Sequence, residues 1–141
     1  MDLTFTPADE RDVDAIYTLS EDLIRRYEDL TAIDPAKVLA WVRRKIAANI
    51  TEYRRINRAD VHVGYFRLTP YEDGWELDDL YIFPDFQNQG IGTAVVRSCC
   101  ARGPVTLYVF TRNTGAVALY RRLGFRQIRQ VSPTRLILRK D

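Results

Sequence analysis

The stretch Gln87-Asn88-Gln89-Gly90-Ile91-Gly92 decides the fold, because it joins a segment rich in β-formers to a helix through a glycine turn. Glycine has no Cβ, so the backbone of such a turn can approach a ligand closely. The first turn of the following helix offers N–H groups that lack intrahelical acceptors and carry a partial positive charge. A strand, a glycine turn and a helix N-terminus therefore predict a phosphate-binding site.

Two familiar phosphate motifs do not fit this stretch. The first glycine of G-x-G-x-x-G is missing, and no Gly-Lys-Ser/Thr follows, as a nucleoside triphosphate loop requires. Taken alone, the two glycines would equally suit an ordinary tight turn. The sequence on either side of residues 87–92 must therefore decide between a phosphate-binding turn and an ordinary tight turn.

Upstream of the turn, the sequence predicts a short strand, two helices and three strands. After a strand at 3–6, Thr6-Pro7 has the form of a helix cap, and apolar residues at three- and four-residue steps predict a helix over 8–29. Asp34-Pro35 predicts a second helix that reaches about residue 50. The pattern then changes to β-formers, with strands expected at 51–56, 61–69 and 74–83.

Downstream of the turn, a helix is expected from Gly90 until Gly103-Pro104 stops it. A strand at 105–110, a helix at 114–123 and a hairpin of strands at 125–131 and 134–139 complete the chain. The order β-α-α-β-β-β-α-β-α-β-β predicts an α+β fold. No repeat or linker interrupts it, so we expect one domain over 1–141.

Composition narrows the function. The net charge of +2 arises from 21 basic and 19 acidic residues spread along the chain, which argues against a nucleic-acid partner. No apolar run approaches the ~20 residues that cross a bilayer, and the N-terminus lacks the pattern of a secretion signal. We therefore expect no membrane partner. Adjacent Cys99 and Cys100 are poorly placed for a disulfide with each other, so we expect free thiols and a cytoplasmic location.

Two runs make the interpretation specific. Residues 77–92 resemble the central signature of the GCN5-related N-acetyltransferase (GNAT) superfamily, Gln/Arg-x-x-Gly-x-Gly/Ala after a strand. Residues 113–125 resemble its second signature, an asparagine followed by a short helix that carries a tyrosine and ends in Gly-Phe. The motif order and the element order both match that family. The resemblance implies the acyl-CoA N-acyltransferase fold, an α/β/α sandwich with a mixed, mostly antiparallel sheet whose fourth and fifth strands splay apart. It also implies acetyl-CoA as cosubstrate and an amine as acceptor.

The resemblance also implies where the coenzyme binds. Backbone N–H groups from Gln89 to Thr93 would hold the pyrophosphate, and Gln87 would shape the loop. The pantetheine arm would pair with the main chain of the fourth strand as an added strand, and Asn113 would bridge the fifth strand to that arm. The implied coenzyme-binding residues are Leu80, Tyr81, Ile82, Gln87, Asn88, Gln89, Gly90, Ile91, Gly92, Thr93, Asn113 and Tyr120.

Acetyl transfer to an amine needs a proton acceptor and a proton donor. Tyr120 falls on the motif tyrosine and is the expected donor to the departing thiolate. Glu76, placed where relatives that use a glutamate base have it, is the first candidate acceptor, because a carboxylate of raised pKa can deprotonate an amine. Strand alternation puts Asp78 on the same face as a second candidate and Asp79 on the other; water alone is the third alternative.

Other nucleophiles and functions are weaker interpretations. We expect His62 to be a packed or surface residue and Cys99 to be a core residue. We expect no covalent intermediate on Cys100, and favour direct transfer in a ternary complex without a metal. A domain that binds acyl-CoA without catalysis is the alternative function. The sequence leaves open the acceptor, a small-molecule or protein amine, as well as the acyl-chain preference and a possible homodimer.

Overall fold

The computed structural model describes all residues 1–141 and contains one 7-stranded sheet in the order β1-β2-β3-β4-β5-β7-β6. Every neighbouring pair is antiparallel except β4 and β5, which run parallel. This confirms the predicted mixed, mostly antiparallel sheet. The strands are β1 Leu3–Pro7, β2 Tyr53–Arg58, β3 Val61–Tyr71, β4 Gly74–Ile82, β5 Val105–Phe110, β6 Arg126–Ser132 and β7 Arg135–Lys140.

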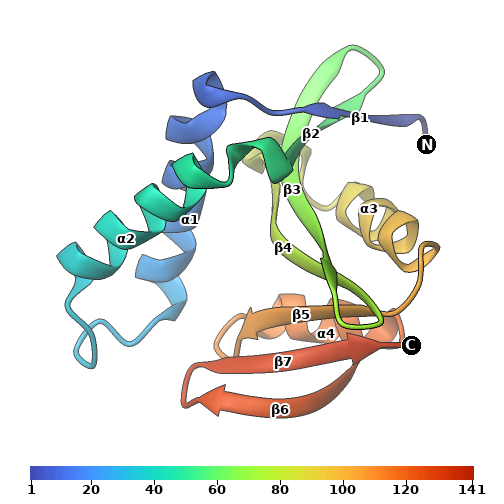
Figure 1. Cartoon of the computed structure of the whole chain (residues 1–141). Coiled ribbons are helices and arrows are strands. Elements are labelled where there is room, and N and C mark those ends of the chain that lie inside the picture. Colours follow the sequence, from blue (N-terminus) through green and yellow to red (C-terminus); the bar gives the residue numbers. More distant parts are fainter.

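Helices cover both faces of this sheet. Helices α1 (Val13–Tyr27) and α2 (Pro35–Ala48) lie on one side, and α3 (Ile91–Cys100) lies on the other (Figure 1). One apolar cluster joins α3 and the partly buried side of α4 (Thr114–Arg122) to the sheet, and a second joins α1 and α2 to β2, β3 and β4. The α/β/α sandwich is confirmed, with the element order as predicted.

The start of the first helix was predicted wrongly. Pro7 is the last residue of the edge strand β1, where its missing N–H is tolerated, and it does not begin a helix. Asp9 is the cap instead: its carboxylate accepts from the Arg11 N–H at 2.9 Å, and its own N–H donates to Asp12 at 2.9 Å. A 3-10 turn over Glu10–Asp12 follows, so α1 covers 13–27 and not 8–29.

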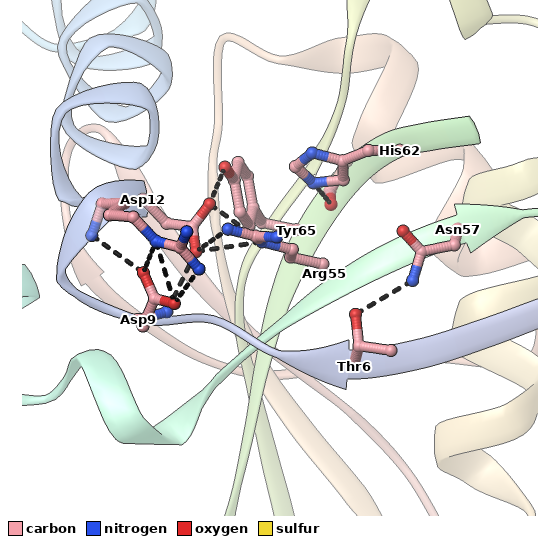
Figure 2. Close-up of polar contacts among 9 residues, drawn as sticks. Thr6, Asp9, Asp12, Arg55, Asn57, His62 and Tyr65 are labelled. Atoms are coloured by element: carbon pink, nitrogen blue, oxygen red, sulfur yellow. Dashed lines mark hydrogen bonds and ion pairs between the residues drawn. The ribbon is translucent and has the colours of Figure 1, made fainter. Parts of the chain in front are cut away.

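A buried ion pair fixes this start against the sheet (Figure 2). Asp12 is only 4% exposed, and both of its oxygens accept from Arg55 Nε on β2 at 3.0 Å. The Tyr65 hydroxyl on β3 donates to it at 2.7 Å. Burial raises the pKa of Asp12, but the hydrogen bonds from Arg55 and Tyr65 outweigh burial and hold that pKa below its usual value.

Two irregularities of β4 create the site. Arg67 of β3 faces Asp78 and Tyr65 faces Tyr81, so two residues of β4 oppose one of β3. This β-bulge gives Asp79 a left-handed φ of 49°. On its other edge, β4 pairs with β5 only at Trp75, Glu76 and Leu77, after which the strands separate (Figure 1). The implied splay of the fourth and fifth strands is confirmed.

Candidate active site

A cleft of about 470 Å³ opens where β4 and β5 separate. Its walls come from α1, α2, β4, β5 and α4, and the cleft reaches the turn before α3 through Pro84 and Gln87. The second half of β4 forms one wall with Leu80, Tyr81 and Ile82. Because β5 does not pair with this half of β4, the cleft can admit an extended chain beside the strand.

The turn before α3 presents a row of free amides. No group of the protein accepts a hydrogen bond from the backbone N–H groups of residues 88–93. Gly90 has a φ of 82° and Asn88 a φ of 62°, left-handed conformations that turn the chain sharply into the helix. At Gly92 an added Cβ would meet nothing nearer than Ile82 Cγ1 at 3.9 Å, so the space before the amides is open. These features fit a pyrophosphate.

Side chains brace this turn. Gln87 Nε2 donates to the Ile82 carbonyl at 3.0 Å, and Gln89 Nε2 donates to the Asp85 carbonyl at 3.2 Å. Arg58 Nη1 donates to Gln89 Oε1 at 2.7 Å, which brings a cation to the edge of the turn. The turn is therefore held in shape from β2 and β4 while its amides stay free.

Tyr120 and Asn113 lie in the opposite wall of the cleft. The Tyr120 ring packs edge-on against Phe125 with centroids 5.5 Å apart, and its hydroxyl has no hydrogen-bond partner in the protein. Burial and the neighbouring Cys99 raise the pKa of Tyr120 to about 12, so the phenol stays protonated at neutral pH. Asn113 caps α4 by accepting from the Ala116 N–H at 3.2 Å, which leaves its Nδ2 free as a donor.

The three acidic residues of β4 occupy different surroundings. Glu76 shares a face with Asp78, and burial together with the Asp78 charge raises the pKa of Glu76, but Glu76 does not line the cleft. Asp78 lines it and lies 3.5 Å from both Lys45 Nζ and Arg67 Nη1. Asp79 lines it as well, accepting from the hydroxyls of Tyr53 and Tyr81.

The prediction that Asp79 points away from Asp78 is therefore wrong. Strand alternation assumes one residue opposite one residue, and the bulge at Asp79 breaks that count. A signal was present in the sequence: aspartate is disfavoured in strands and tolerates left-handed φ, so two successive aspartates inside β4 mark an irregular position.

Residues expected to be packed are packed. The His62 ring packs edge-on against Tyr65 and Phe83, with centroids at 4.7 and 4.9 Å. Its Nε2 meets the Gly64 carbonyl at 2.9 Å (Figure 2). Cys99 is buried in the α3 core, Cys100 is partly buried, and both are free thiols. None of the three lines the cleft.

The strand order and the splay of β4 and β5 are those of the acyl-CoA N-acyltransferase fold. The chain belongs to the acetyltransferase (GNAT) family, whose model matches residues 14–125. None of its helices has the length and apolar composition that crossing a bilayer requires.

Two named relatives of the chain are N-acetyltransferases. The chain is 38% identical to the peptidyl-lysine N-acetyltransferase YjaB of Salmonella typhimurium over 68 residues, which are 48% of this chain and 44% of YjaB. It is 29% identical to YjaB of Escherichia coli over 118 residues, 82% of this chain and 69% of that protein. In two of the curated matches the chain spans less than half of the relative, 26% and 44% of its length.

A solved structure extends the likeness to the whole fold. The PaiA N-acetyltransferase of Thermoplasma acidophilum, in complex with coenzyme A, matches 100% of this chain and 99% of its own with a TM-score of 0.71. The sequence identity is 15%, so this match concerns the fold alone.

Proposed function

We propose that the protein transfers the acetyl group of acetyl-CoA directly to a primary amine in a ternary complex. The observation that carries the proposal is the row of free amides at residues 88–93, next to a cleft that also holds Tyr120, Asp78 and Asp79. A diphosphate bound by those amides places an acyl-bearing arm along the open edge of β4.

Each wall of the cleft has a role in this reaction. Residues 88–93 bind the pyrophosphate, with Gln87 shaping the turn, and the main chain of Leu80, Tyr81 and Ile82 aligns the arm. Asn113 Nδ2 donates to the arm from the far wall. Tyr120 hydrogen-bonds the sulfur and supplies a proton to the departing thiolate. Of the two carboxylates that the sequence offers for the amine proton, Asp78 lines the cleft, whereas Glu76 lies outside its lining.

The acceptor panel follows from the relatives. The YjaB proteins are named peptidyl-lysine N-acetyltransferases, so lysine peptides come first, followed by polyamines and amino acids. We place this activity in the cytoplasm, whose reducing conditions suit the free thiols Cys99 and Cys100.

The test measures coenzyme binding and turnover separately. Calorimetry with acetyl-CoA should show saturable binding, and the amine panel should release coenzyme A in proportion to acetylated product. Binding without turnover on the whole panel would instead establish the alternative, an acyl-CoA-binding module. Absence of binding would reject both functions.

A further inference from the structure

The bulge in β4 brings two adjacent carboxylates into one cleft, and their partners differ. We propose that Asp79 is the catalytic residue that accepts the proton of the acceptor amine, while Asp78 beside it pairs with Lys45 and Arg67. This inference rests on the proposed function. It gives a catalytic role to Asp79, which strand alternation had predicted to lie on the opposite face from Asp78.

Asp79 is held in place by a chain of hydroxyl groups. Tyr53 at the start of β2 donates to one oxygen of its carboxylate, and Tyr81 donates to the other at 3.0 Å. The Tyr81 hydroxyl also meets Ser20 Oγ of α1 at 2.7 Å. An ionised carboxylate has about four acceptor sites, so two hydrogen bonds leave it able to bind an amine. Asp79 is thus oriented but not saturated.

The other two carboxylates are less available to an acceptor amine in the cleft. Asp78 lies 3.5 Å from both Lys45 Nζ and Arg67 Nη1, so its carboxylate already pairs with two cations. Glu76 stands outside the cleft lining. Asp79 forms no ion pair within 4 Å, so no cation occupies its carboxylate.

The surroundings of Asp79 raise its pKa toward neutral pH. The polar and charged groups around it are Ser20 on α1, Lys45 on α2, Tyr53 on β2, Arg67 on β3, and Asp78 and Tyr81 on β4. Burial and the negative charge of Asp78 raise the pKa of Asp79 to about 6, while the hydrogen bonds from Tyr53 and Tyr81 and the charge of Lys45 act against this rise. A base near neutrality suits catalysis at physiological pH.

The proton count of the reaction closes with Asp79 in this role. The ammonium form of the acceptor gives one proton to Asp79, and the neutral amine attacks the thioester carbonyl. The C–N bond forms and the C–S bond breaks, and the departing thiolate takes its proton from Tyr120. The second amine proton restores the Tyr120 hydroxyl, and Asp79 returns the first proton to solvent. One proton is released per acetyl group transferred.

The shape of the pH profile separates this role from a structural one. An alkylamine has a pKa of about 10. With Nα-acetyl-lysine amide or spermidine as acceptor and acetyl-CoA saturating, wild-type kcat/KM should rise to about pH 6–7 and then level off. For Asp79→Asn it should be about 100-fold lower at pH 7 and climb about tenfold per pH unit toward pH 10, as the acceptor deprotonates by itself. A packing defect would give no such recovery.

Two further variants should move the rising part of the kcat/KM profile below pH 7, here called the acid limb, in opposite directions. Tyr53→Phe removes a donor that stabilises ionised Asp79, so the limb should shift to higher pH. Asp78→Asn removes a neighbouring negative charge, so the limb should shift to lower pH. Both comparisons keep the test available if Asp79→Asn fails to fold, which its thermal unfolding and coenzyme A affinity would show.

Failure of this inference is distinct from failure of the function. A folded, coenzyme-binding Asp79→Asn protein with the wild-type profile, or a limb that neither Tyr53→Phe nor Asp78→Asn moves, overturns the role of Asp79 alone. A wild-type protein that binds acetyl-CoA but acetylates no amine overturns the proposed function, and the role of Asp79 with it.

Discussion

At the scale of single residues, Tyr120 combines a packed ring with a free hydroxyl. The ring contacts Phe125 and the α3 core, and the hydroxyl has no hydrogen-bond partner in the protein. Tyr120→Phe should therefore keep the fold and the coenzyme affinity while lowering kcat about 10- to 100-fold, within or just below the usual range for loss of a proton donor. Stopped assays for kcat and calorimetry for coenzyme affinity check this. Equal kcat in both proteins would show that the tyrosine serves packing only.

Asp12 is a charged residue that is only 4% exposed. Asp12→Asn leaves Arg55 without its carboxylate, and because Arg55 is still 30% exposed we expect a loss of about 1–3 kcal/mol of unfolding free energy at pH 7. The fold lowers the pKa of Asp12, so this stabilisation is present above the unfolded-state pKa of about 3.9. It disappears as pH falls through the lower folded-state pKa. Urea unfolding at pH 7 and near pH 3 should show the gap closing.

A matched control lies two residues further on. The Asp14 side chain is 83% exposed and pairs with the exposed Arg43. Surface ion pairs contribute little, so Asp14→Asn should leave the urea midpoint nearly unchanged at both pH values. If Asp14→Asn cost as much as Asp12→Asn, burial of the ion pair would not be the source of the stabilisation.

Residue-level prediction succeeded where a side chain belongs to a motif and failed where the backbone departs from ideal geometry. Tyr120 and Asn113 were predictable because motif spacing fixes their element, and both line the cleft. Asp79 was not, because its direction depends on the register of β4 against β3, a non-local property. The helix cap at Asp9 was missed because Thr6-Pro7, just before it in the chain, has the sequence pattern of a helix start.

At the scale of elements, the turn before α3 can be tested by charge alone. Gly92 lies in the first turn of the helix with open space beside it, so both glutamate and glutamine fit there sterically. Gly92→Glu adds a negative charge against the diphosphate and should weaken coenzyme A binding by about 100-fold or more. Gly92→Gln should weaken it clearly less, and both variants should unfold near the wild-type temperature. Calorimetry gives the affinities. Equal losses of affinity in both variants would show that side-chain size, and not negative charge, weakens binding.

Gly90 differs from Gly92 because its φ of 82° strains any residue with a Cβ. Gly90→Ala should cost about 1 kcal/mol of stability even though the nearest atom, Met1 Cε, is 3.8 Å from an added Cβ. Chemical denaturation of Gly90→Ala beside Gly92→Ala measures this difference. Identical stabilities would mean that the turn relaxes to another conformation.

Periodicity was sufficient to predict the elements themselves. Each expected strand and helix exists, and strand β5 at 105–110 matches its predicted bounds. The 3-10 turns at 10–12, 50–52 and 84–86 were not predicted, because a single turn is too short to show a hydrophobic period. The splay of β4 and β5 came from the family resemblance, since nothing in either strand's composition shows where pairing ends.

At the scale of the whole molecule, the two halves of the sheet meet through a short junction. Between β4 and β5 the pairing stops at Leu77, and the cleft beyond it separates the α1–α2 side from β5 and α4. Only the Thr134 hydroxyl, bonded to Glu28, and Arg112, which donates to the Glu28 carbonyl at 3.2 Å, join the far ends by hydrogen bonds across this gap. A ligand that spans the cleft should therefore stabilise the protein globally.

Thermal unfolding with ligand fragments tests that coupling. Coenzyme A at 100 times its Kd should add about 2.7 kcal/mol, which for a domain of this size is a rise in Tm of roughly 8–11 °C. Pantetheine at the same concentration lacks the pyrophosphate, cannot use the amides of residues 88–93, and should give a far smaller rise. Gly92→Glu should abolish the effect of coenzyme A without lowering the ligand-free Tm. If pantetheine stabilised the wild type as much as coenzyme A does, the amides before α3 would have no part in binding, because the arm alone would account for the whole stabilisation.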